Sequence, residues 1–404
     1  MLQVPVLTGA RTQTSIHDVP DDLLETILLR VSSPVHLARA GAACKLWRRV
    51  IADGRFAARF RSMHAPAVAG YYFNSFRSFR RMPGPSGSIR PSFDPSPSTG
   101  IDPRYFSLDF LSDDVIAGTH SAIVLDSRGS LLLIEFEGLR YFRGSFPAAL
   151  VVCEPLTQRY EKIPRPRDFD GGCTYLRSYL VDGKTGCDDP ISMSSFRVLC
   201  DMYRGGVAHA AMFTAGGSED SWSEKAIDHV SPVLDHTRLI KGRAGGCWYF
   251  YIQGMTWIVL DGATGEYSSL DLPTTVDWGL NGDYTRMHRF YVAEGRDGKP
   301  RIFSFKDNTV KVFARLGGDG EWALERSLLL RYHEHWDTSV WAKGPGFIVV
   351  ALEVSWVNEH VNLRQLLSVD LETMEVKPAE EDKFRIHHPC TLPCPPTLRA
   401  CLDG

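Results

Sequence analysis

The sequence of 404 residues predicts an α+β multidomain protein, in which a small helical unit precedes a larger, mostly antiparallel β domain. Three observations predict this fold class. Apolar residues recur at helical spacing between Leu23 and Val31. A stretch rich in Pro, Ser and Gly at residues 84–103 then separates the two parts. From Tyr105 onward, short runs of β-branched and aromatic residues alternate with turn residues.

The first predicted helix has a well-marked start. Pro20 suits the first turn, where its missing N–H costs nothing. Asp21, Asp22 and Glu25 place negative charge at the positive end of the helix dipole. One face of this helix is apolar and consists of Leu23, Leu24, Ile27, Leu28 and Val31.

Two further short helices are predicted. Ser33 can cap the second helix and Pro34 can occupy its first position, and Leu37 then points inward. After a break near Gly41, a third segment carries apolar residues at helical spacing: Cys44, Trp47, Val50 and Ile51. The predicted unit therefore holds three helices within residues 16–62, after a flexible leader at residues 1–15.

A unit of this size buries little apolar surface and usually depends on a partner or a neighbouring domain. Its pattern alone fits an ordinary helical subdomain as well as a partner-binding module. In the order of its residues, the unit resembles the F-box, which docks on a Skp-type adaptor of a cullin-RING ubiquitin ligase. The matching positions are Pro20, Leu23, Ile27, Val31, Leu37, Cys44, Lys45, Trp47 and Arg48. Val19 and Ala43 depart from the family pattern, each with a smaller apolar side chain than usual, which weakens apolar contact slightly.

This resemblance implies an adaptor-binding face and two sets of partners. The residues assigned to the face are Pro20, Leu23, Leu24, Ile27, Leu28, Val31, Leu37, Cys44 and Trp47. The implied partners are a Skp-type adaptor, through it a cullin, and a target protein bound by the β domain. No target-binding residue can be assigned from the sequence.

The rest of the chain is expected to comprise a linker with a Pro/Ser/Gly-rich loop (63–104), a β domain (105–385) and an irregular tail (386–404). Within the β domain an apolar strand, a turn rich in Asp, Gly or Thr, and an aromatic or charged strand recur loosely. Hairpins are predicted from Ala122, Leu150, Phe196, Trp257, Val310 and Leu366. Repeats of a few antiparallel strands favour an irregular β-propeller of roughly six blades. A pair of β-sandwiches is the alternative.

One hairpin carries a second resemblance. The sequence VVCEPLTQRYEKIP at residues 151–164 is similar to a hairpin of plant F-box-associated and kelch-like domains, with Glu154 where Asn is usual. Together the two resemblances imply a plant F-box protein with a kelch-like β-propeller domain. Its expected role is that of a substrate-recognition subunit of an SCF-type ubiquitin ligase, not an enzyme. The alternatives are a propeller enzyme, such as an oxidase or lyase, and an interaction scaffold outside ubiquitin transfer.

The charge is distributed unevenly along the chain, although the formal net charge is only −3. Residues 1–104 hold 14 Lys/Arg against 7 Asp/Glu, whereas residues 105–404 hold 31 against 41. A basic N-terminal part favours an acidic protein partner, since no nucleic-acid-binding motif accompanies the arginines. Nucleic acid is therefore not expected as a partner.

Other functional classes are disfavoured by composition. No apolar run approaches the roughly 18 residues of a membrane span, and the N-terminus lacks the features of a secretory signal. Nine cysteines, an odd number without a C-x-x-C pair, fit free thiols in a reducing compartment. The expected location is therefore cytoplasmic or nuclear, without a membrane. No metal or cofactor is predicted, because prolines interrupt the cluster of His387, His388, Cys390 and Cys394.

Overall fold

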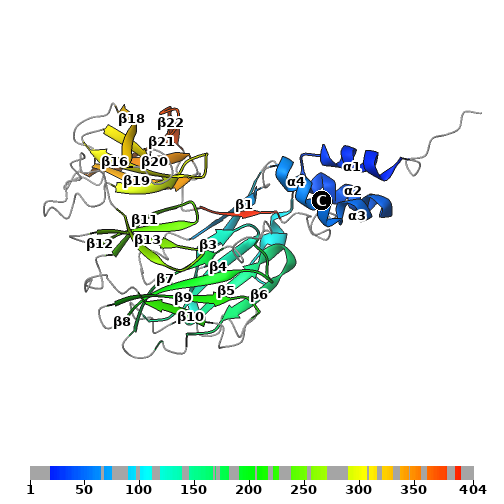
Figure 1. The fold of residues 1–404 in the computed structure, drawn as a ribbon, viewed down its shortest axis with the longest axis horizontal. Helices are drawn as coiled ribbons and strands as arrows, with labels where there is room; N and C mark the ends of the chain where they lie inside the picture. Colours follow the sequence, from blue (N-terminus) through cyan, green and yellow to red (C-terminus); the bar gives the residue numbers. More distant parts are fainter. Residues whose placement is uncertain are drawn as a thin grey trace, which may run out of the picture.

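The computed structural model describes residues 19–64, 68–74, 90–96, 101–111, 119–138, 145–166, 169, 173–181, 191–204, 207–216, 222–226, 238–252, 256–270, 290–306, 309–315, 321–330, 337–344, 346–355, 362–379 and 387–392. Four short helices lie together at one end of the molecule, and β-sheets form the rest (Figure 1). Within these ranges, no helix has the length and apolar character that crossing a membrane requires. The predicted leader, residues 1–15, lies outside them.

The four helices form a unit that we call the helical module. They are α1 (Asp21–Leu29), α2 (Pro34–Ala43), α3 (Lys45–Ile51) and α4 (Gly54–Met63). The predicted starts of the first two are confirmed: Pro20 precedes α1, and the Ser33 hydroxyl accepts a hydrogen bond from the His36 N–H at the start of α2. Both starts depend on residues within a single turn, which the sequence displays directly.

The fourth helix corrects the predicted three-helix unit. The Asp53 carboxylate caps α4 by accepting hydrogen bonds from the N–H groups of Arg55 and Phe56, at 2.8 and 3.3 Å. Phe56 and Phe60, one turn apart, then enter the core of the module, each 2% exposed. This helix is not predicted from the sequence, because the segment is rich in arginine. The two buried phenylalanines are what packs it in the module core.

In the part of the chain that the structure describes, the β domain consists of five four-stranded antiparallel units, which we number as sheets in chain order; the third and fourth are joined into one eight-stranded sheet. The first contains β3 (Thr119–Arg128), β4 (Leu131–Gly138), β5 (Ala149–Glu154) and β6 (Arg159–Ile163); the second β7 (Cys173–Val181), β8 (Arg197–Arg204), β9 (Val207–Thr214) and β10 (Trp222–Ala226); the third β11 (Arg238–Ala244), β12 (Cys247–Ile252), β13 (Thr256–Asp261) and β14 (Tyr267–Leu270). The fourth contains β15 (Phe290–Glu294), β16 (Pro300–Lys306), β17 (Thr309–Arg315) and β18 (Trp322–Leu329); the fifth β19 (Asp337–Gly344), β20 (Phe347–Ser355), β21 (Asn362–Asp370) and β22 (Val376–Ala379). A parallel pairing of Gly242 with Val292 joins the third and fourth sheets. Such a series of meanders is propeller-like.

All six predicted hairpins are confirmed by the strand pairing. They correspond to β3–β4, β5–β6, β8–β9, β13–β14, β17–β18 and β21–β22. Three of them share a turn that begins with an acidic residue and has Thr three positions later. Asp261 and Asp370 each accept hydrogen bonds from the two following turn N–H groups, while the Thr157 hydroxyl donates to Glu154. Each turn then contains one residue with positive φ: Gln158, Gly265 and Met374.

A small sheet at the boundary of the β domain corrects the predicted domain limits. Its strands are β1 (Val68–Phe73), β2 (Ser92–Pro95) and β23 (His387–Thr391), in the order β2-β1-β23. The expected linker therefore supplies two strands, and the expected irregular tail supplies one. Local pattern could not reveal this sheet, because β1 pairs with a strand from the far end of the chain.

The small sheet is tied to the first four-stranded sheet by a side chain. Asn74, directly after β1, donates from Nδ2 to the Val124 carbonyl and accepts from the Val124 N–H at Oδ1, both at 2.8 Å. In this way the amide side chain replaces a strand residue beside β3. In Figure 1, β1 and the red β23 run side by side between the helical module and the larger sheets.

Candidate docking face on the helical module

Helix α1 has a buried and an exposed apolar face. Leu24 and Leu28 are each 2% exposed and pack in the module core. Leu23 and Ile27 are 55% and 57% exposed, although they lie one turn apart on the same helix. Since residues are spaced by about 100° around a helix, these two pairs project from different sides of α1.

Pro20, Leu23 and Ile27 form what we call the outer stripe of α1. Pro20 is also exposed and lies three residues before Leu23. Among the described residues, the large apolar side chains left exposed are Leu23, Ile27, Met63, Tyr71, Leu324, Leu329 and Val376. Two adjacent members of this set on one short helix mark a surface suited to a protein partner.

The residues expected on the adaptor-binding face divide into three groups. The outer stripe is exposed, while Val31, Cys44 and Trp47 are half-buried. Leu24, Leu28 and Leu37 are buried in the module core, which corrects their assignment to a contact surface. A helix this close to its neighbours must bury one apolar side to be stable, and the sequence pattern does not distinguish that side from the exposed one.

Ion pairs flank α1 and connect it to the other helices. Arg49 of α3 contacts Asp21 at 2.8 Å, and Arg59 of α4 contacts Glu25 at 2.5 Å. The first pair is largely exposed and adds little stability. The two pairs connect α1 to α3 and to α4.

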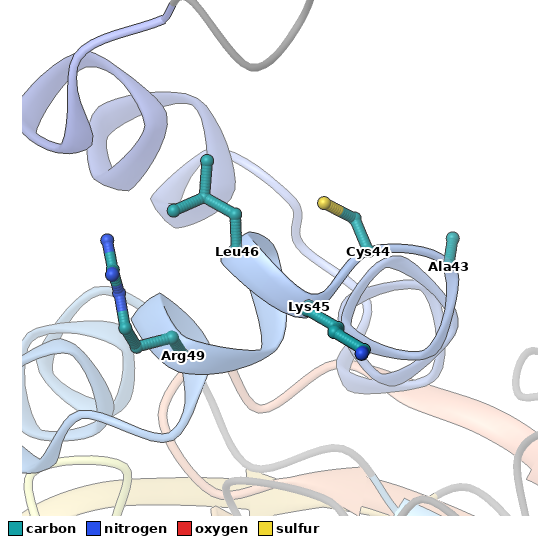
Figure 2. A pocket seen from close by; sticks show the side chains of 5 residues that line it. All are labelled: Ala43, Cys44, Lys45, Leu46 and Arg49. Atoms are coloured by element: carbon teal, nitrogen blue, oxygen red, sulfur yellow. The ribbon is translucent and has the colours of Figure 1, made fainter.

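A shallow pocket of about 590 Å³ lies at the start of α3 (Figure 2). It is lined by Ala43, Cys44, Lys45, Leu46 and Arg49. Its lining combines apolar atoms with two cationic side chains, of which Arg49 is paired with Asp21. Figure 2 shows Leu46 and Arg49 on the side of α3 that faces α1.

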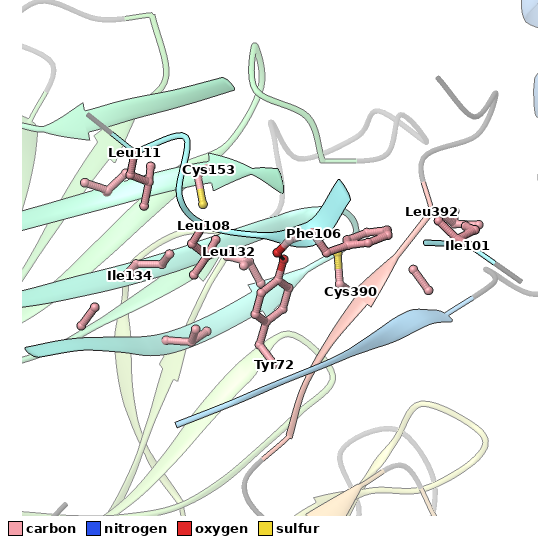
Figure 3. Packing of buried hydrophobic residues seen from close by; sticks show 14 of the residues in the cluster. Tyr72, Ile101, Phe106, Leu108, Leu111, Leu132, Ile134, Cys153, Cys390 and Leu392 are labelled. Carbon is pink, nitrogen blue, oxygen red and sulfur yellow. Dashed lines mark hydrogen bonds between the residues drawn. The ribbon is translucent and has the colours of Figure 1, made fainter. Parts of the chain in front are cut away.

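The opposite side of the module is attached to the β domain. Val35 and Ala38 of α2 belong to the same hydrophobic core as β1, β23 and the first four-stranded sheet. At the centre of this core (Figure 3), the Tyr72 hydroxyl donates a hydrogen bond to the Phe106 carbonyl at 2.6 Å. The helical module therefore shares a hydrophobic core with the β domain and is not a separately packed domain.

The titratable groups in this core are buried and neutral, which fits a structural role. Burial raises the pKa of Tyr72 well above its ordinary value and raises the pKa of the Cys390 thiol to about 12, so both groups stay neutral near pH 7. His388 and Cys390 are buried within β23, and Cys394 lies outside the described residues. In the part of the chain that the structure describes, no group of three or more His, Cys, Asp or Glu residues is arranged to hold a metal ion.

No protein-family model matches this chain, and no curated protein matches it in sequence. Solved structures with a similar arrangement include a protein from Lactobacillus plantarum, with 10% identity, a TM-score of 0.37, and coverage of 80% of this chain and 98% of the other. The α-L-arabinanase of Penicillium chrysogenum gives 12% identity, a TM-score of 0.33 and coverage of 63% and 77%. The Cps50 (Swd1) β-propeller domain of Myceliophteria thermophila gives 9%, 0.32, and 64% and 85%. At such low values none of these proteins carries its activity over to this chain.

Proposed function

We propose that the helical module is an F-box and that the protein recruits a target to an SCF-type ubiquitin ligase. The observation that carries this proposal is the outer stripe of α1. Leu23 and Ile27 remain more than half exposed, whereas the other side of the same helix is buried. Exposing two neighbouring apolar side chains is unfavourable in water unless a partner covers them.

The order of residues in the module supports a Skp-type adaptor as that partner. Cys44, Lys45 and Trp47 follow the family pattern, and they lie at the start of α3 beside the cationic pocket. An acidic adaptor would complement Lys45 and Arg48, whose guanidinium donates to backbone carbonyls of α2, and this would mainly raise the rate of association.

The β domain is the part of the chain that we propose for target binding. We infer a six-bladed propeller in which the five four-stranded sheets are five blades and the β2-β1-β23 sheet is the sixth. In this arrangement strands from both ends of the domain close the ring, which removes long exposed sheet edges. The protein would perform no bond chemistry itself, because its contribution is to raise the local concentration of a target near the ligase.

The experiment that tests the proposal is capture of a purified Skp-type adaptor and its cullin by the full chain. The variant is Leu23→Ala with Ile27→Ala, which changes only exposed side chains and should leave the protein folded. We expect it to retain less than about a tenth of wild-type adaptor binding, since buried apolar anchors dominate interface energy.

A matched control is Leu324→Ala with Leu329→Ala, which removes two equally exposed leucines from β18. This control should bind the adaptor as the wild type does. If the wild type captures no adaptor, or if the control loses binding as strongly as the α1 variant, the F-box proposal is wrong. A wild type that captures the adaptor without the cullin would instead favour a scaffold outside ubiquitin transfer.

A further inference from the structure

Three consecutive sheets of the β domain converge on one carboxylate. Asp126 of β3 accepts hydrogen bonds from the N–H of Ser127 at 2.9 Å and from the N–H of Leu180 on β7 at 3.0 Å. It also contacts the Arg243 guanidinium of β11 at 3.2 Å. The strands that meet here are the first strands of the first, second and third sheets, so the residue lies where these sheets come together.

Positive charge exceeds negative charge around Asp126. Burial raises its pKa to about 6, against the opposing effect of Arg128 and Arg177, so the carboxylate is ionised at neutral pH. Asp126 therefore lies near three arginines, Arg128, Arg177 and Arg243. Asp201, which is opposite Arg177 in the β7–β8 register, is buried and accepts a hydrogen bond from the Tyr267 hydroxyl at 2.9 Å.

The guanidinium group of Arg243 is oriented so that it can bind a further anion. Arg243 stacks over the Trp248 ring at 4.5 Å, which orients its planar fork. Its Nη1 contacts Asp126, while its Nη2 has no hydrogen-bond partner among the residues that the structure describes. Leaving a guanidinium N–H unsatisfied inside a protein is unfavourable, and a ligand oxygen is a natural partner for it.

The cluster is also within reach of solvent. The side chains of Asp126 and Arg243 are 19% and 23% exposed, and Arg177 on β7 is exposed. Arg177 at the surface and the partly buried Arg243 both lie near Asp126. Guanidinium groups suit carboxylate and phosphate oxygens because they can form two parallel hydrogen bonds.

We propose that Arg177 and Arg243, with Arg128 adding positive charge, form a binding site for an acidic side chain of the target protein. This proposal specifies the target chemistry for the β domain and so rests on the proposed function. The anion is a carboxylate or phosphate group carried on a peptide segment. With Asp126 and Asp201 counted against the three arginines, one positive charge is in excess, and it would attract such a segment.

The test measures peptide binding to the full chain by fluorescence anisotropy. The probes are a short fluorescein-labelled peptide rich in Glu, the same peptide with Gln at each Glu, and the Gln peptide with one phosphoserine. We expect the wild type to bind the Glu peptide, the phosphoserine peptide or both, and not the Gln peptide. The Arg177→Gln variant should bind at least about tenfold more weakly, as expected for loss of a charge-assisted hydrogen bond.

Arg326→Gln is the matched control, because Arg326 is an exposed arginine on β18, outside the three converging sheets. It should bind the peptides as the wild type does. Equal weakening in this control would indicate nonspecific attraction and overturn the proposal, as would the failure of both acidic peptides to bind. Binding of inorganic phosphate without either acidic peptide would overturn it too.

Two further variants separate this site from the adaptor proposal and from folding. Leu23→Ala with Ile27→Ala should bind the acidic peptide normally, and Arg177→Gln should still capture the adaptor. Arg243→Gln would leave Asp126 without its ion pair and could unfold the protein. The proposal therefore stands or falls on Arg177, which is exposed.

Discussion

Helices α1 and α2 are neighbours in the chain and are both rich in apolar residues, yet they differ in what covers them. Helix α1 buries Leu24 and Leu28 and exposes Leu23 and Ile27. Helix α2 is covered on two sides. Its Leu37 lies in the module core, whereas Val35 and Ala38 lie in the core shared with the β domain.

This difference assigns the two helices separate roles. Helix α2 attaches the module to the β domain, and α1 is left with an exposed apolar side, which we propose is covered by a partner. Because α2 packs in both cores, the outer stripe of α1 is held in a fixed orientation relative to the sheets. Substitutions on the two helices should therefore differ strongly in their effect on stability.

The largest expected effect comes from a charge placed between α2 and the β domain. Val35→Asp should lower the free energy of unfolding by about 4 kcal/mol or more, because Val35 is 2% exposed and the carboxylate would be buried without a partner. Urea unfolding followed by fluorescence measures this. Ile27→Asp on the outer stripe is the control and should cost less than about 0.5 kcal/mol. Similar losses for both variants would contradict the contrast between the helices.

The next effect tests the other side of α2. Leu37→Ala should cost about 3 kcal/mol, since Leu37 is fully buried and its loss leaves a cavity in the module core. Leu324→Ala, which removes a side chain that is 53% exposed, should change stability little. Adaptor binding by Leu37→Ala should fall in proportion to unfolding only, since Leu37 does not reach the surface. A specific loss of binding by folded Leu37→Ala would return this residue to the contact surface.

A smaller effect is expected in the core that joins α2 to β1. Tyr72→Phe should cost about 1–2 kcal/mol, because the Phe106 carbonyl would lose its buried hydrogen bond from the tyrosine hydroxyl. Thermal unfolding of wild type and variant provides the comparison. Tyr71→Phe, at a residue that is 37% exposed, should have the smaller effect. The reverse order would mean that this hydrogen bond is unimportant for attaching the module.

The smallest effect on stability is expected on α1 itself. Leu23→Ala with Ile27→Ala should change the free energy of unfolding by less than about 0.5 kcal/mol per residue, because both side chains are already in water. Calorimetry of the full chain measures it. A loss of several kcal/mol would show that the outer stripe supports the fold, and reduced adaptor binding could then not be read as a lost contact.

Much of the local architecture could be predicted because its causes are local. The starts of α1 and α2 depend on Pro20, Ser33 and Pro34, which act within one turn. The hairpin turns at Asp261 and Asp370 close through hydrogen bonds that span three residues. The β character of the domain and all six predicted hairpins followed from such signals.

What required the structure involves residues far apart in the chain. The pairing of β1 with β23 and the convergence of Asp126 with Leu180 and Arg243 depend on the path of the whole domain. The arginines of this cluster lie in separate strands, so no spacing in the sequence connects them. The only hint in the sequence is an arginine, Arg243, five residues before a tryptophan, Trp248, and such a pair is too common to indicate a binding site.

The sequence by itself determined that α1 is an amphipathic helix with more apolar residues than one face needs. Only the tertiary structure decided that Leu24 and Leu28 face the core and that Leu23 and Ile27 face solvent. The physical reason is that helical periodicity depends on the chain within a few residues, whereas burial depends on which distant elements arrive to cover each side. The docking of α2 on the β domain, through Val35 and Ala38, was decided in the same way.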